Sequence, residues 1–336
     1  MNTLVRILLL LTLIVVIPFD IGCFKLIEPT MVVETPVVVH PAKPKVILIT
    51  LDGVRWQEVF NGSDPILYHG KKITARELLP NLYHYFVDNG MVVGKESEFI
   101  ATGPMHISLP GYLEIMRGHP STDCQSNECT NVKLNETMAD LFEESAVIAS
   151  WDTIKLTVSD NPDRFVINCG RSYRSKGWFK AELEEKKDYP VYWEDPEYRP
   201  DFLTEEVALD YLQYYSPGFL WISFGDTDEW AHANNYEKYL EQLKHSDEFI
   251  GQVIKMVNSV SDYKDYTFVI TADHGRGAGW FYHGGEPESA RNWLMMYGRG
   301  IPNKGFVSYK ETKSLSNIKP TIKRIVTGTP NKDSLL

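Results

Sequence analysis

The sequence predicts an α/β fold in which a central, mostly parallel sheet carries helices on both faces. Short apolar runs alternate with helical patterns along the chain, an order typical of parallel strands joined by crossover helices. The runs are continuously apolar, as expected of strands that are buried on both faces. With 336 residues, 43% hydrophobic and 24% charged, the chain can form one large domain or two small ones around a sizeable core.

The predicted elements follow one another in that alternating order. Strands are expected at residues 46–51, 146–150, 165–168, 218–224 and 266–271, with 293–297 as a further candidate. The clearest helical pattern runs from about 236 to 257, with one apolar face from Tyr239 to Val257. Other helical patterns cover residues 75–88, 136–145, 202–215 and 316–327. Residues from about 170 to 200 are instead dense in charged and aromatic side chains, and we expect an insertion or cap there.

The N-terminus carries a targeting segment. Arg6 precedes an apolar run over residues 7–19, whose length fits a signal peptide better than a membrane span. We expect residues 1–23 to be a signal peptide or N-terminal anchor and the proline-containing residues 24–44 to be a tether. Cleavage near Cys23, a lipoprotein site and an uncleaved anchor with membrane association stay open. Each alternative predicts that the folded part is secreted, periplasmic or extracellular.

Charge and cysteine content narrow the partners and the compartment. A net charge of −11 argues against a broad nucleic-acid-binding surface, which needs a basic patch. Cys124 and Cys129 could close a small disulfide loop in an oxidising compartment, and two free thiols are the alternative. A four-cysteine zinc site is disfavoured because the sequence has no second close pair.

Three carboxylates directly follow predicted strands. Asp52, Asp228 and Asp273 come after the runs at 46–51, 218–224 and 266–271. Because ligands sit beyond the carboxyl ends of parallel strands, we expect these side chains to converge on one edge of the sheet. Their mutual repulsion would be costly unless cations compensate it. A single such Asp would more simply be a helix cap or turn residue, so the hypothesis of a metal site depends on the combination.

Histidines accompany these carboxylates. His232 lies four residues after Asp228, so one helical turn would bring both onto the same face. His274 is adjacent to Asp273, and His283 in a glycine-flexed loop is a further candidate ligand. Mixed carboxylate and imidazole ligation suits Zn²⁺ best, with manganese or iron as substitutes.

Ser108 is the candidate nucleophile. It precedes Leu109 and Pro110, a pattern typical of a helix N-terminus, where free backbone N–H groups point at an incoming anion. A serine there could attack phosphorus if a metal ion lowered the pKa of its hydroxyl. A helix-capping serine is the alternative interpretation.

Taken in order, these segments resemble the alkaline phosphatase superfamily, most closely its nucleotide pyrophosphatase/phosphodiesterase branch. The motifs that carry the resemblance are Leu51-Asp-Gly, Ser108-Leu-Pro-Gly-Tyr, Asp228-x-x-x-His, Asp273-His-Gly and the late His283. The resemblance spans roughly residues 45–328 and implies a catalytic domain at 45–330 that contains the insertion.

The resemblance also implies roles for individual residues. Two divalent metal ions per chain would be held, one by Asp228, His232 and His283, and the other by Asp52, Asp273, His274 and the Ser108 oxygen. Ser108 would form a phosphoserine intermediate, and Asn127 falls where the branch places a phosphate-binding asparagine. Asp226 competes with Asp228, whose spacing to His232 matches the motif.

The leading hypothesis is hydrolysis of a small-molecule phosphate ester, a phosphodiester or nucleotide pyrophosphate in preference to a monoester. The alternatives are a phosphomonoesterase, a phosphoalcohol transferase acting on envelope lipids or glycans, and a non-catalytic surface binding protein. Ser108 departs from the threonine usual in the branch. Tyr112 stands where sulfatases of the superfamily place an arginine, which counts against a sulfatase.

Overall fold

The computed structural model describes residues 43–170, 197–260 and 265–336. The predicted signal peptide or anchor, nearly all of the tether and most of the 170–200 insertion lie outside the described residues. Within the described part of the chain, no helix is both long and apolar enough to cross a membrane.

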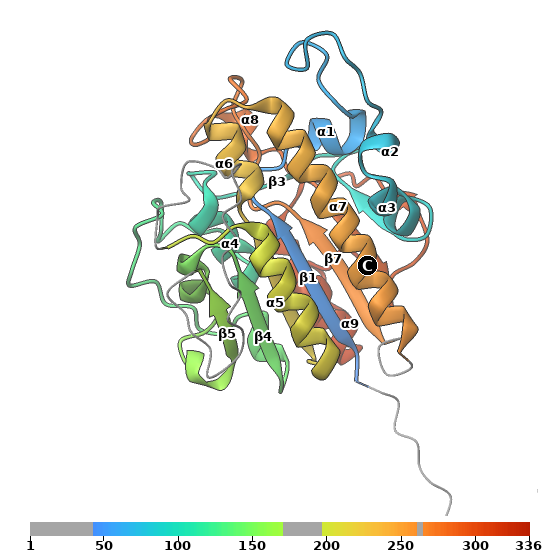
Figure 1. The fold of residues 1–336 in the computed structure, drawn as a ribbon. Helices are drawn as coiled ribbons and strands as arrows, with labels where there is room; N and C mark the ends of the chain where they lie inside the picture. The colour runs from blue at the N-terminus through green and yellow to red at the C-terminus, as the bar shows by residue number, and fades with distance from the viewer. Residues whose placement is uncertain (1–42, 171–196, 261–264) are drawn as a thin grey trace, which may run out of the picture. The chain divides into compact units, whose positions relative to one another are not determined.

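The centre of the fold is an eight-stranded sheet, in which β8 runs antiparallel to its neighbours and the remaining pairs are parallel (Figure 1). In spatial order its strands are β5 (Val166–Cys169), β4 (Ser145–Ala149), β6 (Phe219–Phe224), β1 (Lys45–Leu51), β7 (Tyr266–Thr271), β8 (Leu294–Gly298), β2 (Met91–Val93) and β9 (Gly305–Phe306). A second, small sheet pairs β3 (Phe99–Ile100) with β10 (Lys313–Ser314). The prediction of a mostly parallel sheet is confirmed.

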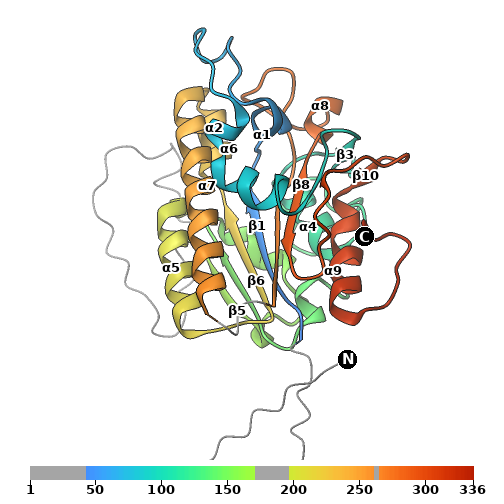
Figure 2. The ribbon, with the colours of Figure 1, turned by 90° about the vertical axis from the view of Figure 1, so that its right-hand side faces the viewer.

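Helices cover both faces of this sheet, as Figure 2 shows. One face packs against α5 (Asp201–Tyr214), α7 (Tyr236–Ser259) and the shorter α1 (Trp56–Asn61), α2 (Ala75–Leu78) and α3 (Pro80–Leu82). The other face packs against α4 (Ser108–Arg117) and α9 (Ile318–Thr327). Two short helices, α6 (Asp226–His232) and α8 (Pro287–Ala290), lie toward the carboxyl ends of the strands (Figure 1).

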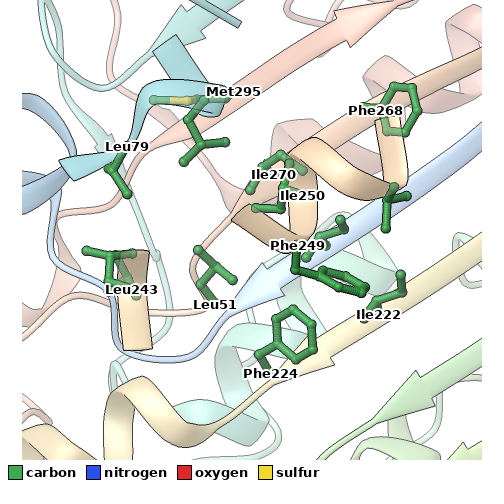
Figure 3. Packing of buried hydrophobic residues seen from close by; sticks show 14 of the residues in the cluster. Leu51, Leu79, Ile222, Phe224, Leu243, Phe249, Ile250, Phe268, Ile270 and Met295 are labelled. Atoms are coloured by element: carbon green, nitrogen blue, oxygen red, sulfur yellow. The ribbon is translucent and has the colours of Figure 1, made fainter. Parts of the chain in front are cut away.

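The core between the sheet and α7 shows how apolar periodicity fixes the layers. Leu51 of β1 and Ile222 and Phe224 of β6 point toward Phe249 and Ile250 of α7 (Figure 3). The rings of Phe224 and Phe249 meet edge to face with centroids 5.2 Å apart, a geometry that adds about 0.5–1.5 kcal/mol to area burial. This packing holds the ends of β1 and β6 beside each other.

Two helix predictions need correction. The helix predicted at 136–145 is wrong, because the segment forms a single 3-10 turn at Ala139–Leu141 and β4 begins at Ser145. The Thr137 amide and hydroxyl both donate to the Asp140 carboxylate, a local bond that competes with helix formation.

The pattern at 75–88 is helical but broken ahead of Pro80, because proline disfavours helical geometry in the preceding residue. It continues as α3 and a π-helical turn at Tyr83–Val87. The Asp247 carboxylate accepts bonds from the Asn81 and Leu82 amides beyond the break. The helices predicted at 202–215, 236–257 and 316–327 are observed with small changes at their ends, as α5, α7 and α9.

Candidate metal centre

Three neighbouring strands at the middle of the sheet deliver the candidate ligands. In the order β6, β1, β7, the strands lie side by side, with Thr50 in register with both Ser223 and Thr271. Asp52 directly follows β1, and α6 follows β6 after a single glycine. The segment after β7 carries Asp273 and His274. The predicted convergence at the carboxyl edge is therefore observed.

Asp52, Asp273 and His274 form a buried cluster, named cluster A, with their ligand atoms within 4.8 Å of one another. His274 Nε2 lies 3.3 Å from Asp52 Oδ1 and 3.2 Å from Asp273 Oδ2. His274 Nδ1 lies 2.7 Å from the Gly275 carbonyl oxygen, which can only accept, so Nδ1 carries the proton in a neutral ring. The Nε2 lone pair then faces two carboxylates, an arrangement that is repulsive without a cation.

The donor set of cluster A fits a divalent metal ion. Among the described residues, the buried Asp273 Oδ2 has no hydrogen-bond partner. Burial lowers the pKa of His274 to about 4, so the imidazole is neutral, as a metal ligand must be. Burial and then the charge of Asp228 raise the pKa of Asp52 to about 7, whereas burial and then Asp52 raise the pKa of Asp273 well above its usual range. Both shifts reflect burial first and neighbouring negative charge second, and a bound cation would oppose both.

Asp228, His232 and His283 form a second cluster, named cluster B. His232 Nε2 lies 3.0 Å from Asp228 Oδ2 and 3.0 Å from His283 Nε2. His283 Nδ1 donates to the His106 carbonyl oxygen at 3.2 Å, which leaves Nε2 available as a ligand. Asp226 is not part of this cluster, and its Oδ2 accepts a bond from the Asp201 amide at 3.2 Å.

The two clusters adjoin each other. The rings of His274 and His283 stack with centroids 3.9 Å apart and an interplanar angle of 23°. Arg276 contacts Asp228 Oδ1 through its guanidinium, a feature that the sequence interpretation missed. The two residues are 48 positions apart, and their spacing gives no signal for the contact.

Ser108 is the first residue of α4, not its cap. The N-cap position is held by Ile107, and Ser108 is buried with its Oγ 3.5 Å from Asp52 Oδ1 and 3.4 Å from His274 Nε2. The capping interpretation of Ser108 is therefore wrong. The hydroxyl instead faces cluster A.

Two other residues of α4 bind it to cluster A. The Tyr112 hydroxyl donates to Asp52 Oδ2 at 2.9 Å, so this carboxylate is oriented from the helix. Gly111 packs directly against the Asp273 backbone, where an added Cβ would lie 2.3 Å from the carbonyl oxygen. The close approach of α4 to the end of β7 therefore depends on a glycine at this position.

Asn127 lies near the start of α4 but outside both clusters. It is exposed, and its Oδ1 accepts a hydrogen bond from the Leu109 amide at 3.0 Å. Its loop is closed by a disulfide between Cys124 and Cys129, whose Cα atoms are 5.8 Å apart. Because Oδ1 accepts this bond, the Nδ2 group of Asn127 can donate to another partner.

A cavity of about 690 Å³ flanks the same helix. Leu109 and Leu113 of α4, Cys129 of the disulfide loop and Phe165 contribute to its wall. The Asp160 carboxylate, also in the wall, accepts bonds from two backbone amides. The cavity therefore presents a largely apolar surface beside the residue that follows Ser108.

Comparison with known proteins supports this arrangement. Residues 202–326 match the family model described as the Metalloenzyme superfamily. This part of the chain is similar to that superfamily, and the solved structures described below share the fold. The matched range contains all of cluster B together with Asp273 and His274, whereas Asp52 and Ser108 precede it. A match to a metalloenzyme family agrees with the candidate metal-binding groups found in the matched range.

A matching curated protein is distant in sequence. The chain is 24% identical over 274 residues to GPI ethanolamine phosphate transferase 1 of Gibberella zeae, covering 76% of this chain but 26% of that protein. It thus spans about a quarter of the length of the curated relative that it matches.

Solved structures share the fold at low identity. BT1596, a 2-O GAG sulfatase, superposes with a TM-score of 0.61 at 16% identity, covering 87% of this chain and 73% of the other. An alkaline phosphatase superfamily protein from Vibrio parahaemolyticus superposes with a TM-score of 0.54 at 14% identity, covering 85% of this chain and 67% of the other. The lipoteichoic acid synthase LtaP from Listeria monocytogenes superposes with a TM-score of 0.54 at 12% identity, covering 87% of this chain and 74% of the other.

Proposed function

We propose that this chain hydrolyses phosphate esters, with phosphodiesters or nucleotide pyrophosphates preferred, and that Ser108 is the nucleophile. The observation that carries the proposal is the position of Ser108 Oγ, which faces cluster A from the first residue of α4. A hydroxyl at a helix N-terminus lies where an anionic phosphoryl group is favoured by free backbone N–H groups.

The two clusters would hold two divalent ions, for which Zn²⁺ is best suited and manganese or iron are substitutes. Cluster A with the Ser108 oxygen would hold one ion and cluster B the other. When bound, such ions stabilise negative charge on the phosphoryl group and favour ionisation of the serine hydroxyl.

The chain's own residues would carry the remaining steps. Ser108 Oγ attacks phosphorus in line, the Oγ–P bond forms, and the bond from phosphorus to the leaving alcohol oxygen breaks. The Ser108 hydroxyl proton leaves as Oγ attacks and ends on the leaving alcohol oxygen, while Oγ is held 3.5 Å from Asp52 Oδ1 and 3.4 Å from His274 Nε2. Water then cleaves the Oγ–P bond and releases the phosphate monoester. Tyr112 keeps Asp52 oriented throughout, and the Asn127 amide would donate to the incoming phosphoryl group.

Sulfate ester hydrolysis is less well supported despite the shared fold. The position expected to carry an arginine in sulfatases holds Tyr112, whose hydroxyl is engaged with Asp52. Likeness at 16% identity to BT1596 concerns the fold alone.

A phosphoalcohol transferase is the second candidate, favoured by the similarity over 274 residues to GPI ethanolamine phosphate transferase 1. The chemistry would differ only in the second half, because an alcohol in place of water would take the group from Ser108. The acceptor would then be a hydroxyl of an envelope lipid or glycan.

We further propose that the domain works outside the cytoplasm. The Cys124–Cys129 disulfide is typical of an oxidising compartment, and the apolar run at 7–19 would direct the chain there or anchor it in a membrane.

One experiment tests the function and separates the two candidates. Metal-depleted full-length protein is reconstituted with Zn²⁺ or Mn²⁺ and assayed on p-nitrophenyl phosphate and methyl p-nitrophenyl phosphate. We expect faster release from the diester, with methyl phosphate as the second product. A new diester formed when ethanolamine or glycerol is added would favour transfer. Absence of metal-dependent release from both esters would contradict the proposal, and Ser108→Ala supplies the inactive control.

A further inference from the structure

Arg276 is a buried cation that touches cluster B without belonging to it. The residue is 2% exposed, and its Nη1 donates to Asp228 Oδ1. Its Nε donates to the carbonyl oxygen of Trp280. One guanidinium therefore joins α6, which carries Asp228, to the loop that carries His283.

We propose that Arg276 is a positioning residue that presents Asp228 and His283 to a divalent ion in cluster B. The inference rests on the proposed metal site and adds a residue to it. It concerns how the ligands are held, and not a contact between Arg276 and the ion.

The contact with Asp228 selects one carboxylate oxygen as the ligand. Oδ1 is engaged by Arg276, whereas Oδ2 lies 3.0 Å from His232 Nε2. A carboxylate held through one oxygen cannot rotate freely, so Oδ2 stays directed at His232, while Oδ1 lies 3.6 Å from His283 Nε2.

The contact with Trp280 fixes the loop that leads to His283. The Trp280 ring packs edge to face on Tyr236 and Tyr239, with centroids 5.1 and 5.8 Å away. Its carbonyl oxygen meets Arg276, so the backbone is held from both sides three residues before His283. Together with the bond from His283 Nδ1 to the His106 carbonyl, this constrains the approach of the imidazole.

Gly53 leaves room for the pair. A Cβ at this position would lie 2.3 Å from Asp228 Oδ1 and 2.5 Å from Arg276 Nη1. Gly53 has a φ of 60°, a backbone conformation that residues with a side chain rarely adopt. The backbone conformation therefore also favours glycine at this position. The segment after β1 thus accommodates the Arg276–Asp228 contact beside Asp52.

Lysine could not replace both contacts. The guanidinium presents donors in a rigid fork that reaches Asp228 and Trp280 at once, whereas an ammonium on a flexible stem would satisfy one of them. Hydrogen-bonding partners of metal ligands typically contribute 10- to 100-fold to metal affinity. We therefore expect a similar loss at cluster B when Arg276 is changed.

The test is a Zn²⁺ titration of metal-depleted full-length protein against a competing chelator, with no substrate present. Wild type should bind two ions. In Arg276→Met one ion should bind about 10- to 100-fold more weakly while the other keeps its affinity. Arg276→Lys, which retains the charge, should recover part of the loss. Near-ultraviolet circular dichroism of the metal-free variants reports whether each is folded. If Arg276→Met does not fold, the titration of Arg276→Lys tests the inference in its place.

A double-mutant comparison assigns the weakened site. His232→Ala removes a ligand of cluster B, so adding Arg276→Met to it should leave the remaining Zn²⁺ affinity unchanged. Wild-type affinity at both sites in folded Arg276 variants would overturn the inference, as would equal weakening of both sites. Fewer than two ions bound by wild type would instead contradict the proposed metal centre itself.

Discussion

Ser108 Oγ lies 3.4 Å from His274 Nε2, although 166 residues separate them in the chain. The contact joins the start of α4 to the segment that follows β7, and it exists because α4 packs closely on that strand end. The reactive hydroxyl, the metal-binding imidazole and the packing of Gly111 are therefore parts of one arrangement.

Gly111→Ala should disturb this arrangement. Alanine is favoured over glycine in a helix by about 0.8–1.0 kcal/mol, but here its Cβ would lie 2.3 Å from the Asp273 carbonyl oxygen. Overpacking of this kind costs about 1–3 kcal/mol, and a displacement near 1 Å at the site can reduce the rate about 100-fold. Chemical denaturation and kcat for the diester measure the two effects.

Gly103→Ala is the matched control for that substitution, because its nearest neighbour, the Ser121 carbonyl oxygen, would be 3.4 Å away. We expect near-wild-type stability and rate from it. Unchanged activity in Gly111→Ala would show that the approach of α4 to Asp273 is not required.

Asn127→Asp separates two roles of this side chain. A carboxylate can still accept the bond from the Leu109 amide, so the melting temperature should be unchanged. It cannot donate to a phosphoryl oxygen and repels it, so KM for the diester should rise about 10-fold or more. Asn127→Ala should lose both functions. Equal KM values for Asn127→Asp and wild type would contradict phosphate binding by Asn127.

The stability of the fold should depend on pH through His245. His245 Nε2 lies 2.9 Å from Glu205 Oε2, and this partner raises the pKa of His245 above its ordinary value. Because the folded pKa is raised, the stabilisation is complete below the unfolded pKa of about 6.5 and is lost as pH rises through the folded pKa.

Chemical denaturation of wild type and of His245→Gln, from a pH below the unfolded pKa to a pH above the folded pKa, measures that contribution. The difference in unfolding free energy should be largest at the acidic end, and below about 1 kcal/mol because His245 is half-exposed. The exposed His84→Gln serves as control. A difference that grows as pH rises would contradict the assignment.

Much of the candidate site follows from local sequence. Asp52, Asp228 and Asp273 could be placed at one sheet edge because each follows a buried strand, and parallel strands bring their carboxyl ends together. His232 could be paired with Asp228 from helical spacing alone. The alternation of strands and helices was sufficient for the fold class.

Other features depend on contacts between distant segments and leave no periodic signal. The hydroxyl of Tyr112 reaches Asp52 across 60 residues, and Arg276 reaches Asp228 across 48. Neither follows from residue type or spacing. The absence of the helix predicted at 136–145 has a local cause, since the hydrogen bonds from Thr137 to Asp140 offer the backbone an alternative to a helical turn.

The most direct test of the central claim is to trap the covalent intermediate. Metal-reconstituted protein is mixed with methyl p-nitrophenyl phosphate, quenched in acid within a turnover, digested and analysed by mass spectrometry. We predict a methyl phosphoryl group on the peptide that contains Ser108, absent from Ser108→Ala, which should still bind metal but release no nitrophenol. Turnover by Ser108→Ala at the wild-type rate, with no adduct on the wild-type peptide, would contradict the account.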